Sequence, residues 1–542
     1  MVDPILPPAR VEAMKRLGLW PGITLLEGLD EAVRLRRDNV AIVDGNSATG
    51  RSTCVTYGEL DEHSRHVAAG LSRLGVRRGD VVAVQLPNWW QFAVLHLACL
   101  RIGAVINPLM PIFRERELTF MLELAETKVL VIPEEFRKFD HADLGRRLQE
   151  KLPTLKHLVV VGTSGPRSFE RELLAAVADD ATSSTWQPVG PDDVVQVLYT
   201  SGTTGEPKGV MHTSNTLFSN LLPYVNRMQL GRDDVILMSS PLAHQTGFMY
   251  GLMMPIYLGG RVVLQDVWEP TLAADLIERE KVTYTMASTP FLADLTEVGA
   301  TRPEAFASLR LFHSAGATIP RALVRDATQR LGATIISGWG MTENGAAATT
   351  RPNDRAEKIF ETDGCAMDGM ELRIVDERGR PLPSGESGHL QVRGCSNFVG
   401  YLHRPQLYGT DESGWFTTGD IARIDEDGYL RITGRSKDVV IRGGENIPVV
   451  EIEGLLYRHP GVREVAIVGR VDPRLGERCA AYVVPRGATP PTLQELTAWL
   501  ADAGVSKTYL PEFLRIVSEL PKTPTGKIQK FQLRAMEAQL DS

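Results

Sequence analysis

The sequence predicts an α/β protein. A large N-terminal domain of helix-covered, mostly parallel sheets with a small β-rich subdomain is expected to precede a small, mobile α/β domain. Three observations favour this fold class. The chain has 542 residues, too many for a single hydrophobic core. Between about residues 192 and 345, β-rich runs alternate with amphipathic helical stretches, which is typical of parallel sheets covered by helices. After about residue 365, short strands and turns replace that alternation.

The alternating region contains runs that read as strands and, between them, stretches with one apolar face. The strands are expected at Val194–Tyr199, Val235–Met238, Arg261–Leu264, Val282–Met286, Leu309–Phe312 and Ala333–Ile336, and helices at Thr271–Glu280 and Arg321–Leu331. An earlier region, with a helix at Tyr57–Leu74 and a strand at Val81–Gln85, has the same texture. We expect it to form a related layer.

The β-rich subdomain begins with strands at Glu371–Val375 and His389–Val392. Asp427-Gly428 then predicts a hairpin turn between strands Ile421–Ile424 and Tyr429–Ile432. Beyond Val462, an α/β module of ordinary domain size is expected from strands Glu464–Val468, Ala480–Val484 and Phe513–Val517 and the helix Leu493–Ala503. The predicted domains are therefore residues 1–434 and 435–542.

Composition excludes several classes of function. A net charge of -8 argues against nucleic acid as the main partner, because binding to a phosphate backbone requires a basic face. The cysteines are far apart and form no Cys-x-x-Cys pair, so zinc and redox chemistry are not expected. They are expected to be buried small hydrophobic residues: Cys54, Cys99, Cys365, Cys395 and Cys479.

No segment reads as a membrane span or a secretion signal. The most apolar stretch, Trp89–Met110, is interrupted by Gln91, His96 and Arg101. It predicts a buried helix leading into a strand at Ala104–Ile106. Because the first residues lack an apolar signal region, the protein is expected in the cytoplasm.

A hydroxyl- and glycine-rich loop with a single lysine, Leu198–Gly209, follows the first strand of the alternating region. Glycine lets the backbone approach a ligand closely, while N–H groups and Thr and Ser hydroxyls can donate to anionic oxygens. The loop is a candidate phosphate site, with a flexible surface turn as the alternative. It is not a Walker A loop, because Lys208 is preceded by Pro207 and followed by Gly209.

A second polar segment, Ser337–Glu343, follows the strand predicted to end near Ile336. It supplies an aromatic, a hydroxyl and a carboxylate side chain at the carboxyl end of a strand, where α/β sheets bind ligands. An exposed acidic turn is the alternative.

Together with further segments, these two motifs resemble the signatures of the adenylate-forming superfamily, which includes acyl-CoA synthetases, luciferases and peptide-synthetase adenylation domains. The matches run in the family order from residue 198 to 528. The further segments are Ser314–Ala317, Thr417–Asp420, Gly434–Asp438, Arg442–Ile447 and Pro521–Ile528. Taken alone, the first four of these segments could each be a simple turn. The resemblance implies a two-domain enzyme that uses ATP.

By this resemblance, the motifs of the large domain bind the nucleotide. The aromatic Trp339, followed by Gly340, would lie beside adenine, and Thr342 would meet phosphate. Glu343 would help hold Mg²⁺, a hard cation that binds one or two carboxylates plus substrate phosphates. The β- and γ-phosphates would be held by Thr200, Ser201, Gly202, Thr203, Thr204, Gly205 and Lys208.

The ribose and the small-residue wall are assigned in the same way. Asp420 would accept hydrogen bonds from the ribose hydroxyls, because an ionised carboxylate is an acceptor only and can take two donors. Arg435 would contact the same ribose. Gly316 and Ala317 would line the adenine and acyl sites. His244 would line or gate the acyl pocket, and a core histidine is the alternative.

The C-terminal motif supplies the residue expected to act in the first half-reaction, Lys527. A carboxylate that attacks the α-phosphate of ATP brings two anions together, so a cation there should stabilise the pentacoordinate phosphorus. Without its motif, Lys527 would read as a solvated surface charge. The resemblance places a hinge at Lys437 and the path of the CoA pantetheine arm at Gly443 and Gly444.

The expected reaction joins a carboxylic acid to CoA through an acyl-adenylate, with ATP, Mg²⁺ and CoA as cofactor and co-substrates. Arg442–Ile447 and Met110–Leu118 resemble the fatty-acid and cyclohexanecarboxylate–CoA ligase branch, so a medium-chain fatty, alicyclic or aromatic acid is expected. The alternatives are an acyl-AMP ligase that loads a separate carrier protein and a non-catalytic nucleotide-binding relative. Homodimers are common in the superfamily, and the same state is an option here.

Overall fold

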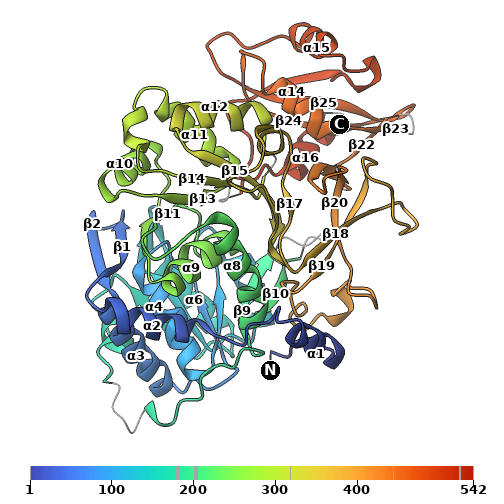
Figure 1. The fold of residues 1–542 in the computed structure, drawn as a ribbon. Coiled ribbons are helices and arrows are strands. Elements are labelled where there is room, and N and C mark those ends of the chain that lie inside the picture. The colour runs from blue at the N-terminus through green and yellow to red at the C-terminus, as the bar shows by residue number, and fades with distance from the viewer. Residues whose placement is uncertain are drawn as a thin grey trace.

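The computed structural model describes residues 2–177, 183–200, 206–317, 319–436, 438–442, 445–523 and 526–540. In Figure 1 the N-terminal and middle parts of the chain (blue to yellow) form one large body, and the last part (orange to red) lies across one end of it. The described helices include none that combines the length and the apolar character needed to cross a bilayer.

A six-stranded sheet forms one layer of the large body, with the order β10-β9-β4-β3-β5-β8. All neighbours are parallel except β10, which forms a hairpin with β9. The strands are β3 (Val81–Val84), β4 (Val105–Pro108), β5 (Val129–Pro133), β8 (His157–Val161), β9 (Val194–Thr200) and β10 (Lys208–Thr213). The helices of this half of the chain are α1 (Pro8–Arg16), α2 (Leu25–Arg36), α3 (Tyr57–Arg73), α4 (Trp90–Ile102), α5 (Glu115–Leu124) and α6 (His141–Lys151).

The apolar stretch near residue 100 is the buried helix α4, which leads into β4 as predicted.

A nine-stranded sheet forms the second layer, with the order β17-β16-β15-β14-β13-β11-β12-β1-β2. Its strands are β1 (Val40–Asn46), β2 (Arg51–Thr56), β11 (Val235–Met238), β12 (Arg261–Gln265), β13 (Tyr284–Ala287), β14 (Leu311–Ser314), β15 (Thr334–Met341), β16 (Gly345–Thr349) and β17 (Cys365–Ala366).

The neighbours from β1 to β15 in this order are parallel. The helices associated with the sheet are α8 (Ser214–Met228), η2 (Gly247–Met253), α9 (Met254–Leu258), α10 (Pro270–Glu280), α11 (Thr289–Gly299), α12 (Arg321–Leu331) and α13 (Ala356–Glu361). The prediction of helix-covered, mostly parallel sheets is confirmed.

One cysteine prediction is wrong. Cys54 lies on the edge strand β2, whose first residues face solvent, and its side chain is exposed.

The strand predicted to end near Ile336 is longer than expected. Strand β15 is parallel to β14 up to the pair Ser314 and Ser337, and then continues to Met341 as an antiparallel partner of β16. The expectation that the Ser337–Glu343 motif follows the strand is therefore wrong for its first five residues. Gly340 permits this pairing, since a Cβ there would lie 1.9 Å from the carbonyl oxygen of Gly345.

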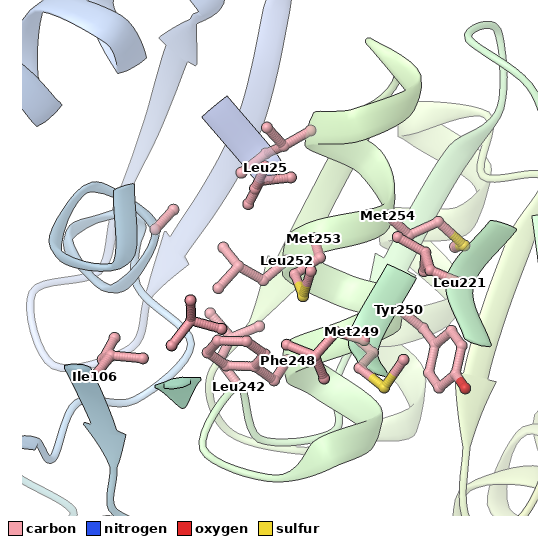
Figure 2. Packing of buried hydrophobic residues seen from close by; sticks show 14 of the residues in the cluster. Leu25, Ile106, Leu221, Leu242, Phe248, Met249, Tyr250, Leu252, Met253 and Met254 are labelled. Carbon is pink, nitrogen blue, oxygen red and sulfur yellow. The ribbon is translucent and has the colours of Figure 1, made fainter. Parts of the chain in front are cut away.

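The largest hydrophobic core lies between the two sheets (Figure 2). Segment Phe248–Met254, which spans η2 and the start of α9, packs there against Leu25 of α2, Ile106 of β4 and Leu221 of α8. A second core fills the space between the other face of the nine-stranded sheet and helices α10, α11 and α12. The two cores fix both layers, and with them the ends of the parallel strands.

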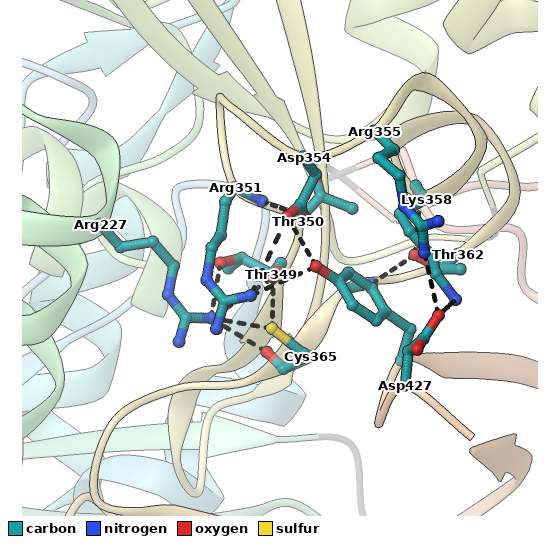
Figure 3. Close-up of polar contacts among 12 residues, drawn as sticks. Arg227, Thr349, Thr350, Arg351, Asp354, Arg355, Lys358, Thr362, Cys365 and Asp427 are labelled. Atoms are coloured by element: carbon teal, nitrogen blue, oxygen red, sulfur yellow. Dashed lines mark hydrogen bonds and ion pairs between the residues drawn. The ribbon is translucent and has the colours of Figure 1, made fainter. Parts of the chain in front are cut away.

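The β-rich subdomain is a four-stranded antiparallel sheet, as predicted: β18 (Met370–Val375), β19 (Gly388–Gly394), β20 (Phe416–Ile424) and β21 (Leu430–Arg435). Polar contacts join it to the large body (Figure 3). Lys358 of α13 lies 2.7 Å from both Asp425 and Asp427 in the β20–β21 turn, and the Tyr429 hydroxyl donates to Asp354 at 2.6 Å. These contacts hold the β20–β21 hairpin against α13 and the segment just before it.

The C-terminal elements form a separate sheet with its own helices: β22 (Val440–Arg442), β23 (Glu445–Ile447), α14 (Val449–Leu456), β24 (Val462–Asp472), β25 (Gly476–Pro485), α15 (Leu493–Asp502), β26 (Phe513–Ile516) and α16 (Lys530–Leu540). They touch the large body through Tyr457, which packs against the core of α10–α12. Arg486 also approaches Glu297 of α11 at 4.0 Å. We call these elements the C-terminal module.

Candidate active site

A cavity of about 1200 Å³ lies where the carboxyl ends of β13, β14 and β15 meet the β-rich sheet and the C-terminal module. Open α/β sheets bind ligands at this end of their strands. Residues predicted for the site from all three parts of the fold line it: Gly316, Ala317, Trp339, Gly340, Asp420, Arg435 and Lys527. The fold therefore brings together positions as far apart in the chain as Gly316 and Lys527.

Asp420, on β20, is held in one orientation at the wall of this cavity. The side chain is buried, with 3% of its surface exposed. Its Oδ2 accepts a hydrogen bond from the Trp339 indole N–H at 3.0 Å, and its Oδ1 lies 2.8 Å from Nε of Arg435. Asp420 and Arg435 are direct partners across the β20–β21 hairpin. Because a carboxylate offers about four acceptor sites, both oxygens can accept further donors from a ligand.

Lys527 belongs to a tight hairpin of the C-terminal module, which Thr523 closes by bonding to the Lys527 and Gly526 backbone. Gly526 has a φ of +79°, and a Cβ there would lie 2.8 Å from Pro290 at the start of α11. Gly526 thus rests directly on the large body. Glycine is suited to both the positive φ and the close approach.

The ammonium group of Lys527 lies in a field of mixed charge. Burial is the main cause that lowers its pKa to about 8, and the nearby Arg435 lowers it further. The carboxylates of Asp420, Asp438 and Glu343 act in the opposite direction. Lys527 is therefore electrostatically coupled both to the Asp420 wall and to the motif that ends at Glu343.

Glu343 lies at the end of the second motif, in the turn that joins β15 to β16. It is buried, and burial raises the pKa of its carboxyl group. The hydroxyl of Tyr401 donates to its Oε1 at 2.8 Å. Lys208, the first residue of β10, places its ammonium 4.8 Å from the centre of the Tyr401 ring. Thr342 is held through its carbonyl oxygen, which accepts from His212 Nε2 at 2.7 Å.

His244 lies in the loop between β11 and η2 and is partly buried. Burial and the charge of Lys527 lower its pKa to about 4, so the ring is neutral at neutral pH. Its Nδ1 accepts from the backbone N–H of Thr246 at 3.3 Å. His244 is not among the residues that line the cavity, and only the charge of Lys527 connects it to that site.

Several predicted positions cannot be placed. Thr200, the last residue of β9, pairs with Lys208 and so marks the base of the glycine-rich loop. The remaining loop residues, the residue expected at the hinge and the two glycines expected along the pantetheine path lie outside the described residues: Ser201, Gly202, Thr203, Thr204, Gly205, Lys437, Gly443 and Gly444.

Comparison with known proteins identifies the family. A family model for AMP-binding enzymes matches residues 29–402, and a model for the C-terminal domain of AMP-binding enzymes matches residues 451–527. The chain belongs to the AMP-binding enzyme family. The predicted membership of the adenylate-forming superfamily, with acyl-CoA synthetases among the relatives, is confirmed.

Matches to individual relatives cover almost the whole length of this AMP-binding enzyme. It is 38% identical to the medium-chain fatty-acid–CoA ligase of Escherichia coli (strain K12), with 97% of this chain and 92% of that protein covered. It is 33% identical to the 2,3-dihydroxybenzoate–AMP ligase of Bacillus subtilis (strain 168), with 97% and 96% covered. The ATP-bound structure of MatB from Rhodopseudomonas palustris superposes with a TM-score of 0.85 at 28% identity, covering 96% of this chain and all of that one. The chain is therefore an ATP-dependent, adenylate-forming carboxylate ligase.

In this AMP-binding enzyme, a bound metal ion would take most of its ligands from the nucleotide. The described parts of the chain contain no cluster of three or more His, Cys, Asp or Glu side chains able to hold a metal ion. Glu343, a single buried carboxylate that contacts Tyr401, fits Mg²⁺, which usually binds one or two carboxylates plus substrate phosphates.

Sequence reasoning missed two residues of the site. Asp438 contributes to the electrostatic environment of Lys527, and Tyr401 contacts both Glu343 and Lys208. The only sequence signal for Asp438 is its place two residues after Ser436 in the Gly434–Asp438 motif. For Tyr401, the sequence carries no local polar pattern that would distinguish it from a core aromatic residue.

Proposed function

We propose that the protein is a carboxylate–CoA ligase. The acid and ATP would form acyl-AMP and pyrophosphate, and the thiol of CoA would then displace AMP to give the acyl-CoA thioester. The observation that carries the proposal is that Lys527 lines the same cavity as Asp420, Arg435 and Trp339. The 38% identity to a CoA ligase along 97% of the chain supports CoA as the acceptor.

In the first step, a carboxylate oxygen of the acid attacks the α-phosphorus, and the bond to the bridging oxygen of pyrophosphate breaks. Asp420 and Arg435 would hold the ribose, and Trp339 would lie against adenine with Gly316, Ala317 and Gly340. Lys527 would stabilise the charge on the α-phosphate, while Lys208 holds the departing phosphates and Thr342 contacts phosphate. Glu343 would bind Mg²⁺, which neutralises phosphate charge when bound.

In the second step, the sulfur of CoA attacks the acyl carbon and the bond to AMP breaks. We propose residues 1–434 and 435–542 as the two domains, with a hinge at Lys437. Rotation there would withdraw Lys527 and bring Gly443 and Gly444 to the acyl-adenylate. His244 would line the acyl pocket. We propose a medium-chain fatty, alicyclic or aromatic acid as the substrate.

The role of Lys527 predicts a specific pH dependence. Its pKa is lowered to about 8, so the ammonium is charged below that pH and loses its charge above it. The value of kcat/KM for ATP in pyrophosphate release should therefore fall as pH rises through 8, by about tenfold per pH unit. In Lys527→Arg the side chain stays positively charged above pH 8, so the activity that this variant retains should not fall over the same pH range. A wild-type rate that is constant up to about pH 9.5, as for an ordinary lysine, would contradict this role.

The acceptor is tested by mass spectrometry of products from ATP, Mg²⁺, CoA and a panel of short, medium-chain, alicyclic and aromatic acids. The expected products are acyl-CoA and AMP in equal amounts, with acyl-AMP retained by the enzyme when CoA is omitted. Accumulation of acyl-AMP in the presence of CoA, with no thioester, would favour loading of a separate carrier protein. Absence of any adenylate across the panel would instead favour a non-catalytic relative or an acid outside the panel.

A further inference from the structure

Tyr401 connects the two charged groups proposed for the phosphate end of the site. It lies in the segment after β19, far in sequence from both of them, and only 3% of its surface is exposed. The hydroxyl donates to Oε1 of Glu343 at 2.8 Å, and the Lys208 ammonium lies 4.8 Å from the ring centre. The latter distance is within the range of a cation–π interaction.

The backbone explains why this side chain arrives there. Val210 of β10 forms a bridge with Tyr401, and the neighbouring N–H of Leu402 donates to the Gly209 carbonyl at 2.8 Å. On its other side, the N–H of Phe398 donates to the Glu343 carbonyl at 2.7 Å. Segment 398–402 is therefore bonded both to the strand that carries Lys208 and to the turn that carries Glu343.

This arrangement keeps the charged groups of Lys208 and Glu343 from forming an ion pair with each other. Among the residues that the structure describes, Lys208 forms no ion pair, and its ammonium contacts the aromatic ring. Glu343 contacts the hydroxyl at the other end of the same side chain. A direct ion pair between them would satisfy each charge with the other, and both would then have to be separated before phosphate or metal could bind.

We infer that Tyr401 is a positioning residue of the ATP site, whose hydroxyl orients Glu343 for the metal and whose ring holds Lys208 for phosphate. This inference rests on the functions proposed above for Glu343 and Lys208. It adds that the two contacts of Tyr401 act separately: loss of the hydroxyl should weaken the metal-dependent part of ATP binding, and loss of the ring should weaken the metal-independent part.

The test is equilibrium ATP binding by calorimetry, measured in excess EDTA and across a range of Mg²⁺ concentrations. In Tyr401→Phe, the Mg²⁺ concentration for half of the metal-dependent gain in ATP affinity should rise by about 10- to 100-fold, the usual effect of losing a residue that orients a metal ligand. Affinity in EDTA should not change. In Tyr401→Leu, affinity in EDTA should also fall, by about 2- to 5-fold.

Tyr408→Phe is the matched control. The Tyr408 ring packs on the same Phe398 ring as Tyr401 does, at 5.0 Å against 4.7 Å, and its hydroxyl donates to the Phe398 carbonyl at 3.2 Å. It therefore loses a comparable hydroxyl beside the same residue without touching Glu343, and it should keep the wild-type Mg²⁺ dependence. Thermal unfolding of each variant measures any general loss of stability.

Glu343→Gln separates the inference from the function on which it rests. If Glu343→Gln shifts the Mg²⁺ dependence and Tyr401→Phe does not, the inference is wrong and the proposed metal ligand stands. If Glu343→Gln itself leaves Mg²⁺ dependence unchanged, the role of Glu343 fails, and the inference with it. Equal losses in EDTA and in Mg²⁺ for Tyr401→Phe would also overturn the inference. If Tyr401→Phe does not fold, the double variant Glu343→Gln/Lys208→Met replaces it. Losses of ATP affinity that add up in the double variant support two separate contacts, and losses that do not add up overturn them.

Discussion

Replacing Lys527 with alanine is expected to slow acyl-adenylate formation by about 100- to 1000-fold, the usual cost of losing one preorganised charge at the developing transition state. Lys527 is partly buried and lines the same cavity as Asp420 and Arg435, so its ammonium is available to a phosphate bound there. Thioester formation from supplied acyl-AMP and CoA should stay close to the wild-type rate, because Lys527 is proposed to act only at the α-phosphate. Single-turnover release of pyrophosphate and formation of acyl-CoA measure the two steps.

Lys522→Ala is the matched control for this change. Lys522 belongs to the same hairpin and lines the same cavity, but its ammonium is paired with Glu464 at 2.6 Å inside the C-terminal module. Its loss should affect pyrophosphate release far less. Unchanged adenylation in a folded Lys527→Ala protein, or equal losses in both half-reactions, would show that Lys527 does not have the proposed role.

Replacing Asp420 with alanine is expected to weaken ATP binding by roughly 10- to 150-fold, which corresponds to about 1.5–3 kcal/mol for hydrogen bonds to a charged group. The change removes the acceptor proposed for the ribose hydroxyls. It also leaves the Trp339 indole N–H without its partner and releases Arg435. Calorimetric titration with ATP measures the loss, and thermal unfolding measures any accompanying loss of stability.

Deoxynucleotides distinguish ribose binding from a purely structural role of Asp420. In the wild-type protein, 2′-deoxy-ATP or 3′-deoxy-ATP should bind more weakly than ATP, and in Asp420→Ala that difference should disappear, as in a double-mutant cycle. Glu297→Ala removes a carboxylate from the same cavity and should preserve the difference. A deoxy penalty that persists in Asp420→Ala would mean that another residue binds the ribose.

Much of the fold follows from local sequence. The strand Val235–Met238 and the helix Arg321–Leu331 have the predicted bounds, because a short apolar run and an amphipathic repeat each reflect burial by their immediate neighbours. The extension of β15 beyond Ser337 could not be foreseen. It depends on β16, whose small residues Gly345 and Ala346 only become partners when the chain turns back after Glu343.

The sequence by itself determined the family motifs, their order and the residue types available for nucleotide chemistry, since these are properties of contiguous segments. Only the tertiary structure decided which of them meet. The hydrogen bond from Trp339 to Asp420 spans 81 residues and that from Tyr401 to Glu343 spans 58. Such contacts depend on the register of several sheets and on where the C-terminal module rests. No periodicity within one segment encodes that placement, because it results from packing among elements that are distant in the chain.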